Sequence, residues 1–206
     1  MLDLLSGLAL PSAGTILVDG APVVGPGTDR GIVFQQYALC PWPTALGNVE
    51  FGLEALRLPR KQRTERARHY LSLVGLAGFE DRYPHQLSGG MKQRVAIARV
   101  LANDAELVLM DEPFGALDAM TRERLQDELL EIWQRTGLTV MFVTHSIEEA
   151  IFLADRVVVM SPGPGRIETE MRIDLPRPRD VSAPDFNDIR RELSRMLHSD
   201  VSRKAA

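Results

Sequence analysis

The segment from residue 107 to residue 144 constrains the fold most, because its pattern indicates a strand, a helix and a second strand. Residues 107–110 (LVLM) are a continuous apolar run, which is typical of a strand buried on both faces of a parallel sheet. The stretch TRERLQDELLEIWQRTG then carries apolar residues at helical spacing and ends at Gly137, and residues 139–144 (TVMFVT) are apolar again. A helical crossover of this kind joins parallel strands. The sequence therefore predicts an α/β fold.

Short β-rich runs on either side extend this pattern. We expect strands over 15–19 (TILVD), 31–34 (GIVF) and 156–161 (RVVVMS), and a more polar strand, RIETEMRID, after the SPGPG turn. Ser146 and Glu149 have the spacing of a capping box, which predicts that a short helix begins there.

Two helical regions complete the expected architecture. From about residue 48 to 105 the sequence is helical in character, and the stretch RKQRTERARHYLSLVG ends at a stop signal, Gly75. We interpret this block as a helical subdomain. An amphipathic tail helix is expected over about 185–198. At 206 residues and 45% hydrophobic composition, the chain is long enough for one core and too short for two, so we expect residues 1–206 to form a single domain.

The composition argues against several classes of protein. A net charge of −4 lacks the basic excess of a nucleic-acid binder. The single cysteine, Cys40, cannot form an intramolecular disulfide, and the four scattered histidines do not have the spacing of a structural zinc site. We therefore expect no nucleic-acid partner and a reducing, cytosolic setting.

The opening segment MLDLLSGLAL does not have the pattern of a signal peptide. Asp3 interrupts its apolar run and no basic residue precedes it. No uninterrupted apolar stretch approaches the roughly 20 residues that span a bilayer. If the protein acts at a membrane, we expect another chain to hold it there.

Polar side chains follow three of the predicted strands. Gln35 follows GIVF, Asp111 and Glu112 follow LVLM, and His145 follows VMFVT. Open α/β sheets bind ligands at the carboxyl ends of their strands, so these residues predict one shared site. Each also has an ordinary structural interpretation, as a helix cap, a loop residue or a surface group.

The run LVLMDEP is more informative than its single residues. A buried strand that ends in Asp and then Glu is an arrangement in which one carboxylate holds Mg²⁺ and its neighbour polarises a water molecule. Mg²⁺ prefers oxygen ligands and keeps several waters. We therefore assign Asp111 to the metal and Glu112 to the water as a hypothesis.

The run LSGGMKQRVAIARVL places Ser88, Gly89 and Gly90 directly before a helical pattern. Glycines let backbone N–H groups come close to an anion, and the helix dipole favours phosphate at this end. The alternative is a glycine-rich turn before a core helix.

Together these segments resemble the ATP-binding subunits of ABC transporters. The segments 87–91 (LSGGM), 107–113 (LVLMDEP) and 115–118 (GALD) resemble the signature motif, the Walker B motif and the D-loop. Gln35 in VFQQYAL and His145 in VTHS resemble the Q-loop and H-loop residues. The resemblance implies a P-loop NTPase-like ABC ATPase core with a mostly parallel sheet and a helical subdomain.

Several segments are most similar to the ATPases of nitrate, sulfonate and taurine importers. They are DRGIVFQQYAL, GFEDRYPHQLSGGM, DEPFGALDAMTRERLQDELLEIW and THSIEEAIFLADRVVVMSPGPGRI. This resemblance implies an ATPase that energises import of such solutes. The resemblance also implies that an ATPase of this kind does not touch the cargo, so the sequence does not indicate a particular solute.

The resemblance also implies roles at an ATP and Mg²⁺ site. Asp111 would assist Mg²⁺ and Glu112 would be the general base for the attacking water. His145 would contact the γ-phosphate, and Gln35 would sense both Mg²⁺ and the water. Ser88, Gly89, Gly90 and Asp118 would have roles at a subunit interface.

That interface belongs to a head-to-tail dimer, in which Ser88, Gly89 and Gly90 would bind the nucleotide held by the second ATPase subunit and Asp118 would lie between the subunits. The resemblance further implies a transmembrane permease that contacts YALCPWPTALGNV, an indirect solute-binding partner, and a place on the cytoplasmic face of the membrane. Trp42 is either a contact anchor for the permease or a buried loop residue.

The sequence contains no GxxxxGK[ST] string. The resemblance implies that this Walker A loop would directly precede Met1, because LDLLSGL, PSAG and TILVDG match its usual continuation. The hypotheses are a longer, active protein and a non-catalytic subunit or remnant that only supplies the signature motif to a partner. An ABC-type ATPase of DNA repair would need long coiled-coil arms, for which the helical block has no room.

Overall fold

The computed structural model describes residues 1–163 and 165–203. The chain divides into two compact units, residues 1–143 and 144–206, and each is described by itself.

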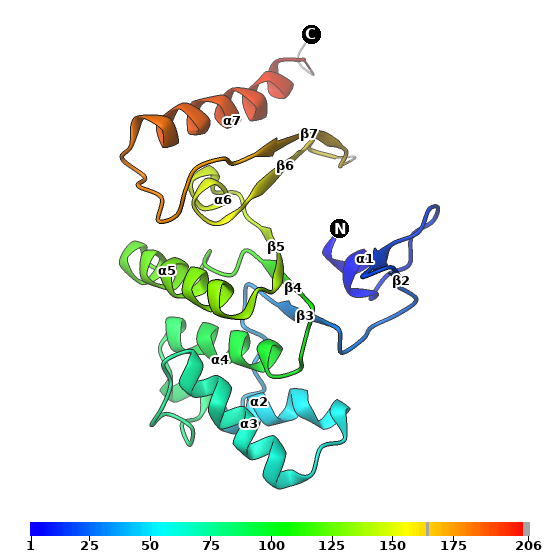
Figure 1. Ribbon diagram of the computed structural model, residues 1–206, viewed down its shortest axis with the longest axis vertical. Helices are drawn as coiled ribbons and strands as arrows, with labels where there is room; N and C mark the ends of the chain where they lie inside the picture. Colours follow the sequence, from blue (N-terminus) through cyan, green and yellow to red (C-terminus); the bar gives the residue numbers. More distant parts are fainter. Residues whose placement is uncertain (164, 204–206) are drawn as a thin grey trace. The chain divides into compact units, whose positions relative to one another are not determined.

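The first unit is built on a parallel sheet. It contains β3 (Arg30–Val33), β4 (Leu107–Asp111) and β5 (Thr139–Val143), in that spatial order. Both pairings are parallel, with Val33 opposite Met110 and Asp111 opposite Val143 (Figure 1). The predicted α/β fold is confirmed.

The crossover between β4 and β5 follows directly from the sequence pattern. Val108, Leu109 and Met110 are almost fully buried, as expected for a strand covered on both faces. The connecting helix α5 (Ala119–Thr136) ends where Gly137 adopts a left-handed conformation with φ of 67°. Glycine adopts this conformation without a steric penalty, so it closes the helix and returns the chain to the sheet.

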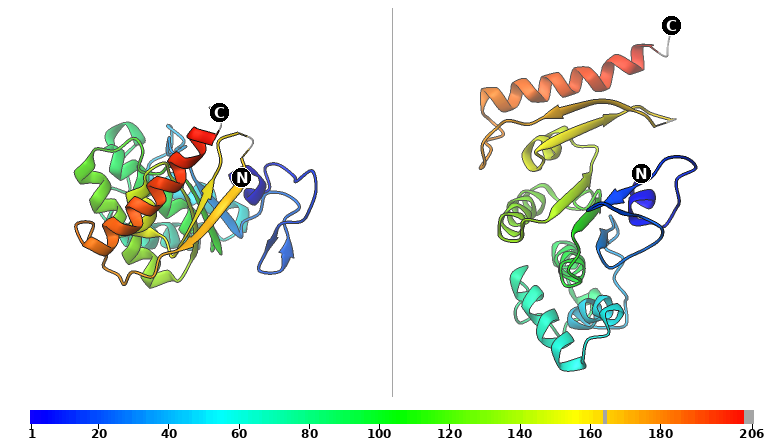
Figure 2. Two further views of the ribbon diagram at one scale, coloured as in Figure 1. Left: turned by 90° about the horizontal axis from the view of Figure 1, so that it is seen from above. Right: turned by 45° about the vertical axis from the view of Figure 1, so that its right-hand side comes forward.

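Helices occupy the region in which the sequence predicted them. They are α2 (Ala45–Leu53), α3 (Arg60–Leu73) and α4 (Gly89–Leu101), with short 3₁₀ turns at Glu54–Leu56 and Pro84–Gln86. Helix α4 contacts β3 on one side and both α2 and α3 on the other (Figure 2). It is therefore the element through which the helical region packs on the sheet.

The N-terminal segment contains α1 (Leu2–Ser6), which packs on β3 and β4. The strand expected over 15–19 is wrong in extent: only β1 (Leu17–Val18) forms, and it pairs with β2 (Ala21–Pro22) outside the parallel sheet. Leu17 is 60% exposed. A strand of high β propensity remains short where no packed surface covers it.

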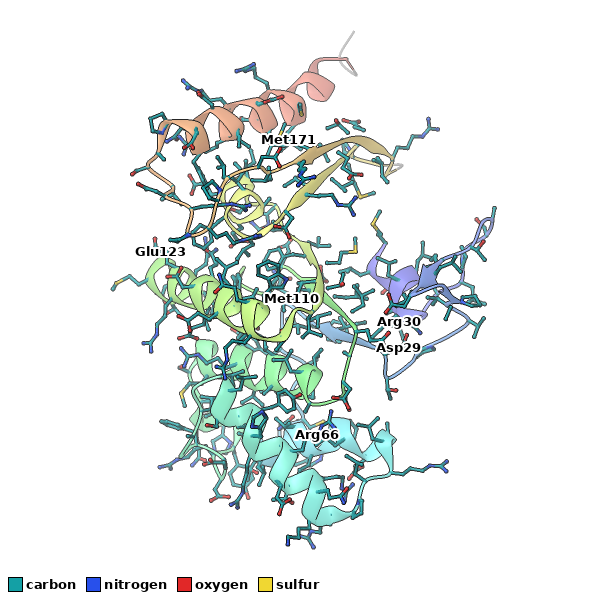
Figure 3. All side chains as sticks on the ribbon, viewed as in Figure 1. Asp29, Arg30, Arg66, Met110, Glu123 and Met171 are labelled. Atoms are coloured by element: carbon teal, nitrogen blue, oxygen red, sulfur yellow. The ribbon has the colours of Figure 1, made fainter. Side chains whose placement is uncertain are left out.

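The start of β3 is held by an ion pair between neighbouring residues. Arg30 Nη1 lies 2.7 Å from Asp29 Oδ2, and Arg30 Nη2 donates to the Gly25 carbonyl at 2.6 Å (Figure 3). The Asp29 carbonyl accepts hydrogen bonds from the backbone N–H groups of Glu106 and Leu107. These bonds fix β3 beside β4.

The second unit contains α6 (Ile147–Leu153), the antiparallel pair β6 (Arg156–Met160) and β7 (Ile167–Arg172), and α7 (Pro184–Arg203). The tail helix expected over 185–198 is present and longer. Buried apolar residues from these elements and the adjoining loop form a separate core, consisting of Ile151, Val159, Ile173, Phe186 and Leu193.

Arg179 joins the loop before α7 to the end of α6. Its side chain is buried, and burial, together with the nearby positive charge of Arg177, lowers the pKa of Arg179. The guanidinium donates at 2.5 to 3.3 Å to backbone carbonyls of Ile151, Phe152, Ala154, Ile173 and Leu175. Three of these belong to the last turn of α6 and its cap, where carbonyls lack helical partners.

No helix among the described residues is both long enough and apolar enough to cross a membrane.

Candidate functional site

The ends of β3 and β4 bring two of the predicted site residues together. Gln35 lies two residues after β3 and Glu112 directly after β4. Gln35 Nε2 donates a hydrogen bond to Glu112 Oε2 at 3.4 Å, although the two residues are 77 positions apart in sequence. The expectation that the carboxyl ends of these strands gather polar groups is confirmed for this pair.

Glu112 has an unusual backbone conformation, with φ of 42°. Its N–H donates to the Val143 carbonyl at 2.9 Å, so it remains tied to β5. Non-glycine residues in this region are strained, and such strain is concentrated at functional sites. The conformation supports a functional role for Glu112.

Gly115, the first residue of the GALD segment, gives the pair the space it needs. A Cβ atom at this position would lie 3.2 Å from Gln35 Nε2 and 3.6 Å from Glu112 Oε2. A side chain here would therefore crowd the Gln35 amide and contact the Glu112 carboxylate.

The donor set at these strand ends fits Mg²⁺. Asp111, the last residue of β4, and Glu112 offer carboxylate oxygens, and Gln35 offers an amide oxygen. Mg²⁺ binds one or two carboxylates in proteins and retains water in its other positions. These residues therefore match the ion that the sequence predicted.

The LSGGM segment begins a long helix. The Ser88 hydroxyl accepts a hydrogen bond from Met91 N at 3.3 Å and caps α4, which places Gly89 and Gly90 in its first turn. A Cβ on Gly89 would lie 3.2 Å from the Tyr37 hydroxyl, and one on Gly90 would lie 3.0 Å from Thr121 Cγ2. The two glycines thus allow close packing as well as an approach of backbone N–H groups to phosphate.

Asp118 caps α5, because its side chain accepts a hydrogen bond from Thr121 N at 3.0 Å. The backbone and side-chain hydrogen bonds of Thr121 lower the pKa of Asp118 below its ordinary value. Asp118 is therefore a negative charge at neutral pH, at the start of the helix that follows the GALD segment.

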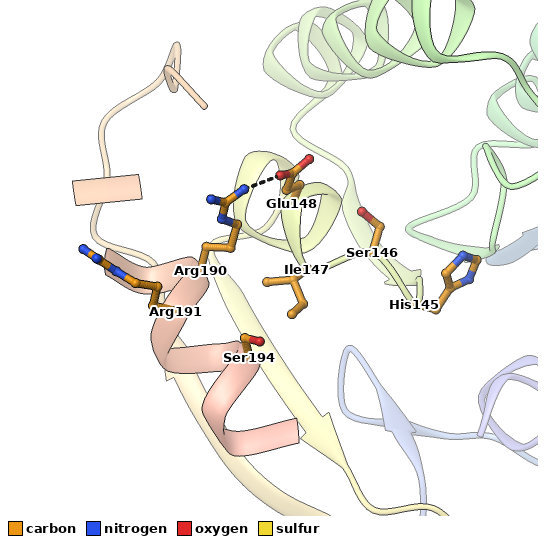
Figure 4. A pocket seen from close by; sticks show the side chains of 7 residues that line it. All are labelled: His145, Ser146, Ile147, Glu148, Arg190, Arg191 and Ser194. Atoms are coloured by element: carbon orange, nitrogen blue, oxygen red, sulfur yellow. Dashed lines mark hydrogen bonds and ion pairs between the residues drawn. The ribbon is translucent and has the colours of Figure 1, made fainter. Parts of the chain in front are cut away.

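His145 belongs to the second unit and lines a pocket of about 410 Å³. Figure 4 shows that the pocket lies at the start of α6 and beside α7, and that Arg190 reaches Glu148 with an Nη1 to Oε1 distance of 2.7 Å. The lining residues are His145, Ser146, Ile147, Glu148, Arg190, Arg191 and Ser194.

The cap of α6 differs in part from the predicted capping box. Ser146 Oγ accepts from Glu149 N at 3.3 Å, as expected. The N–H of Ser146 instead donates to the Thr144 hydroxyl, at 2.9 Å, and that hydroxyl donates to Glu149 Oε2 at 2.6 Å. Thr144 therefore stands between the two residues of the predicted box.

Trp42 is 77% exposed, so the hypothesis that it is a buried loop residue is wrong. It lies between Pro41 and Pro43 in a loop held by the buried Asn48 of α2. Asn48 Oδ1 accepts from Cys40 N at 2.8 Å, and Asn48 Nδ2 donates to the carbonyls of Cys40, Pro43 and Thr44. The indole is thus presented to solvent on a fixed backbone.

Comparison with known proteins agrees with this geometry. The family model described as ABC transporter matches residues 1–115, more than half of the chain. The chain belongs to the ABC transporter ATP-binding family. As a family member it is an ABC-type ATPase with a nucleotide-binding fold, and the predicted family is confirmed.

Curated ABC relatives include importer ATPases. A taurine import ATP-binding protein of Pseudomonas entomophila is 55% identical over 175 residues, 85% of this chain and 68% of the relative. A nitrate import ATP-binding protein of Synechocystis is 50% identical over 200 residues, 97% and 75% of the two chains. An uncharacterized ABC transporter ATP-binding protein of Methanocaldococcus jannaschii is 56% identical over 201 residues, 98% and 75%.

Solved ABC structures share the fold. The ATP-binding cassette MJ0796, described as a dimer in a post-hydrolysis state with ADP and Pi, matches with a TM-score of 0.70 and 34% identity, over 84% of this chain and 78% of that one. The cbiO1 protein of Clostridium perfringens matches with a TM-score of 0.75 and 30% identity, over 84% and 71%.

Proposed function

We propose that this ABC subunit binds and hydrolyses ATP to energise an importer for nitrate-, sulfonate- or taurine-like solutes. The observation that carries the proposal is the contact between Gln35 and Glu112 at the carboxyl ends of β3 and β4. A carboxylate held beside an amide, next to a second carboxylate, suits the activation of water near a phosphate.

In this mechanism Glu112 accepts a proton from the attacking water. Gln35 orients the Glu112 carboxylate and the water through its amide. Asp111, with Gln35, would hold Mg²⁺, which neutralises phosphate charge when it is bound. His145 contacts the γ-phosphate. The strained backbone of Glu112 and the clearance at Gly115 support this assignment.

The active form is a pair of ATPase subunits, most simply two copies of this chain. Ser88, Gly89 and Gly90 at the start of α4 bind the nucleotide held by the second subunit, and Asp118 lies at the interface. The capped N-terminus of α4 supports this role, because its N–H groups and helix dipole favour phosphate.

The partners are a transmembrane permease and, through it, a solute-binding protein, with the ATPase at the cytoplasmic face.

To test the solute class, the subunit should be expressed from its own gene and reconstituted in vesicles with its permease and binding protein. We expect Mg-ATP hydrolysis to rise several-fold when the binding protein carries nitrate, a sulfonate or taurine. Equal stimulation by unrelated sugars or amino acids would refute the solute class.

Trp42 is the proposed anchor for the permease. An exposed tryptophan on a fixed backbone loses little entropy on binding, and such residues often dominate interface energies. We expect Trp42→Ala to reduce co-purification of the permease by at least about tenfold. Ile167→Ala, which truncates another exposed apolar side chain, on β7, is the control and should leave recovery unchanged. Full recovery with the Trp42 variant would exclude it as an anchor.

A further inference from the structure

The loop after β3 has a backbone conformation that its sequence does not favour. Tyr37 and Ala38 are consecutive non-glycine residues with φ of 63° and 47°. The left-handed region is unfavourable for side chains with a Cβ atom, and two such residues in succession need support from their surroundings. The strained pair lies between Gln35 and the loop that presents Trp42.

Arg99 of α4 supplies this support. Its Nη1 donates to the Ala38 carbonyl at 2.7 Å and its Nη2 donates to the Tyr37 carbonyl at 3.1 Å. The planar guanidinium therefore holds both carbonyls at once. A lysine ammonium is a compact point charge and would hold the two carbonyls less well.

Arg99 lies where the C-terminal part of α4 packs closely against α2. The Asn103 amide donates to the Arg99 carbonyl at 2.9 Å. A Cβ atom on Gly52 of α2 would lie 2.6 Å from Asn103 Nδ2 and 3.3 Å from Arg99 Cγ, so α2 and α4 are in close contact here. The stem of Arg99 thus packs directly against α2 on its way to the loop.

The other end of α4 also meets this loop. Gly89, in the first turn of α4, lies beside the Tyr37 hydroxyl, as the 3.2 Å distance to a Cβ placed on Gly89 shows. Tyr37 therefore lies beside α4 with its hydroxyl at the LSGGM end and is bonded to α4 through its carbonyl at the Arg99 end. A shift of α4 would displace the loop at both points.

We propose that Arg99 is a positioning residue that makes the segment from Gln35 to Trp42 follow the movements of the LSGGM helix. The proposal rests on the proposed function, because Gln35 and Trp42 are assigned there to hydrolysis and to the permease. It adds a link by which nucleotide binding at the signature motif would affect both Gln35 and Trp42. A residue that only stabilised the fold would not act selectively on this segment.

The test is hydrogen exchange, measured by mass spectrometry on the chain without nucleotide. Because hydrogen bonds from a charged donor hold the segment, Arg99→Gln should speed exchange in a peptide covering 34–40 by about tenfold. Arg99→Lys should give an intermediate rate, since one ammonium replaces part of the clamp. Arg124→Gln, an exposed arginine on α5, is the matched control and should change nothing in 34–40.

Two results would overturn the proposal. One is exchange in 34–40 that is unchanged in both Arg99 variants. The other is an equal rise in the peptides of α4, α5 and 34–40, which would show only a loss of global stability. If Arg99→Gln does not fold, the comparison of Arg99→Lys with the wild type carries the same decision. Since no ATP is present, these outcomes are independent of whether the chain hydrolyses it.

Discussion

Replacing Glu112 with glutamine is expected to lower ATP turnover by at least about a hundredfold, the usual contribution of a general base. The amide has nearly the shape of the carboxylate and still offers an oxygen to Gln35 Nε2, which donates to it at 3.4 Å in the wild type. It cannot accept a proton from water. ATP binding should therefore persist while phosphate release stops.

The measurement is steady-state phosphate release by the subunit assembled with its permease. Glu123→Gln is the matched control, because it makes the same substitution at an exposed position on α5 (Figure 3). It should keep the wild-type rate. A Glu112→Gln variant that hydrolysed ATP at a rate close to wild type would remove Glu112 from the role of base.

Replacing Arg179 with leucine should destabilise the second unit by about 3 kcal/mol or more. Each hydrogen bond from a charged donor contributes about 1.5–3 kcal/mol, and the leucine would leave carbonyls at the end of α6 without partners in a buried site. Urea unfolding followed by circular dichroism gives the free energy, and hydrogen exchange over residues 144–197 shows which unit is affected.

Arg172→Leu is the control for this prediction. Arg172 forms an ion pair with Asp174 at an Nε to Oδ1 distance of 2.7 Å, and both side chains are more than three-quarters exposed. Exposed pairs contribute at most about 1 kcal/mol, so the same chemical change should have a small effect there. A similar loss in both variants would show that Arg179 does not stabilise the unit through its buried hydrogen bonds.

The sheet could be predicted because its strands carry their own signal. Residues 107–110 are apolar on both faces, and the helix before Gly137 has a regular apolar stripe, so strand, helix and strand follow without tertiary information. The run 15–19 has the same β-rich composition, yet only Leu17–Val18 forms a strand. The composition of a β-rich segment does not reveal whether a neighbouring strand will pair with it.

The site could be predicted only in part. Gln35 and Glu112 meet because both follow parallel strands, which the pattern reveals. Arg99, Asn48 and Arg179 act on backbone carbonyls, and every residue has a carbonyl, so no side-chain pattern shows which ones they reach. Such contacts appear only when the chain is folded.

The central claim is that this subunit and a second ATPase subunit enclose ATP between them. It is tested most directly by light scattering of the Glu112→Gln subunit, expressed from its own gene, with and without Mg-ATP. The mass should double with ATP, because the bound nucleotide is not hydrolysed. An added Ser88→Arg substitution, at the proposed interface between the two ATPase subunits, should prevent the doubling. A mass that stays the same with and without ATP would contradict the claim.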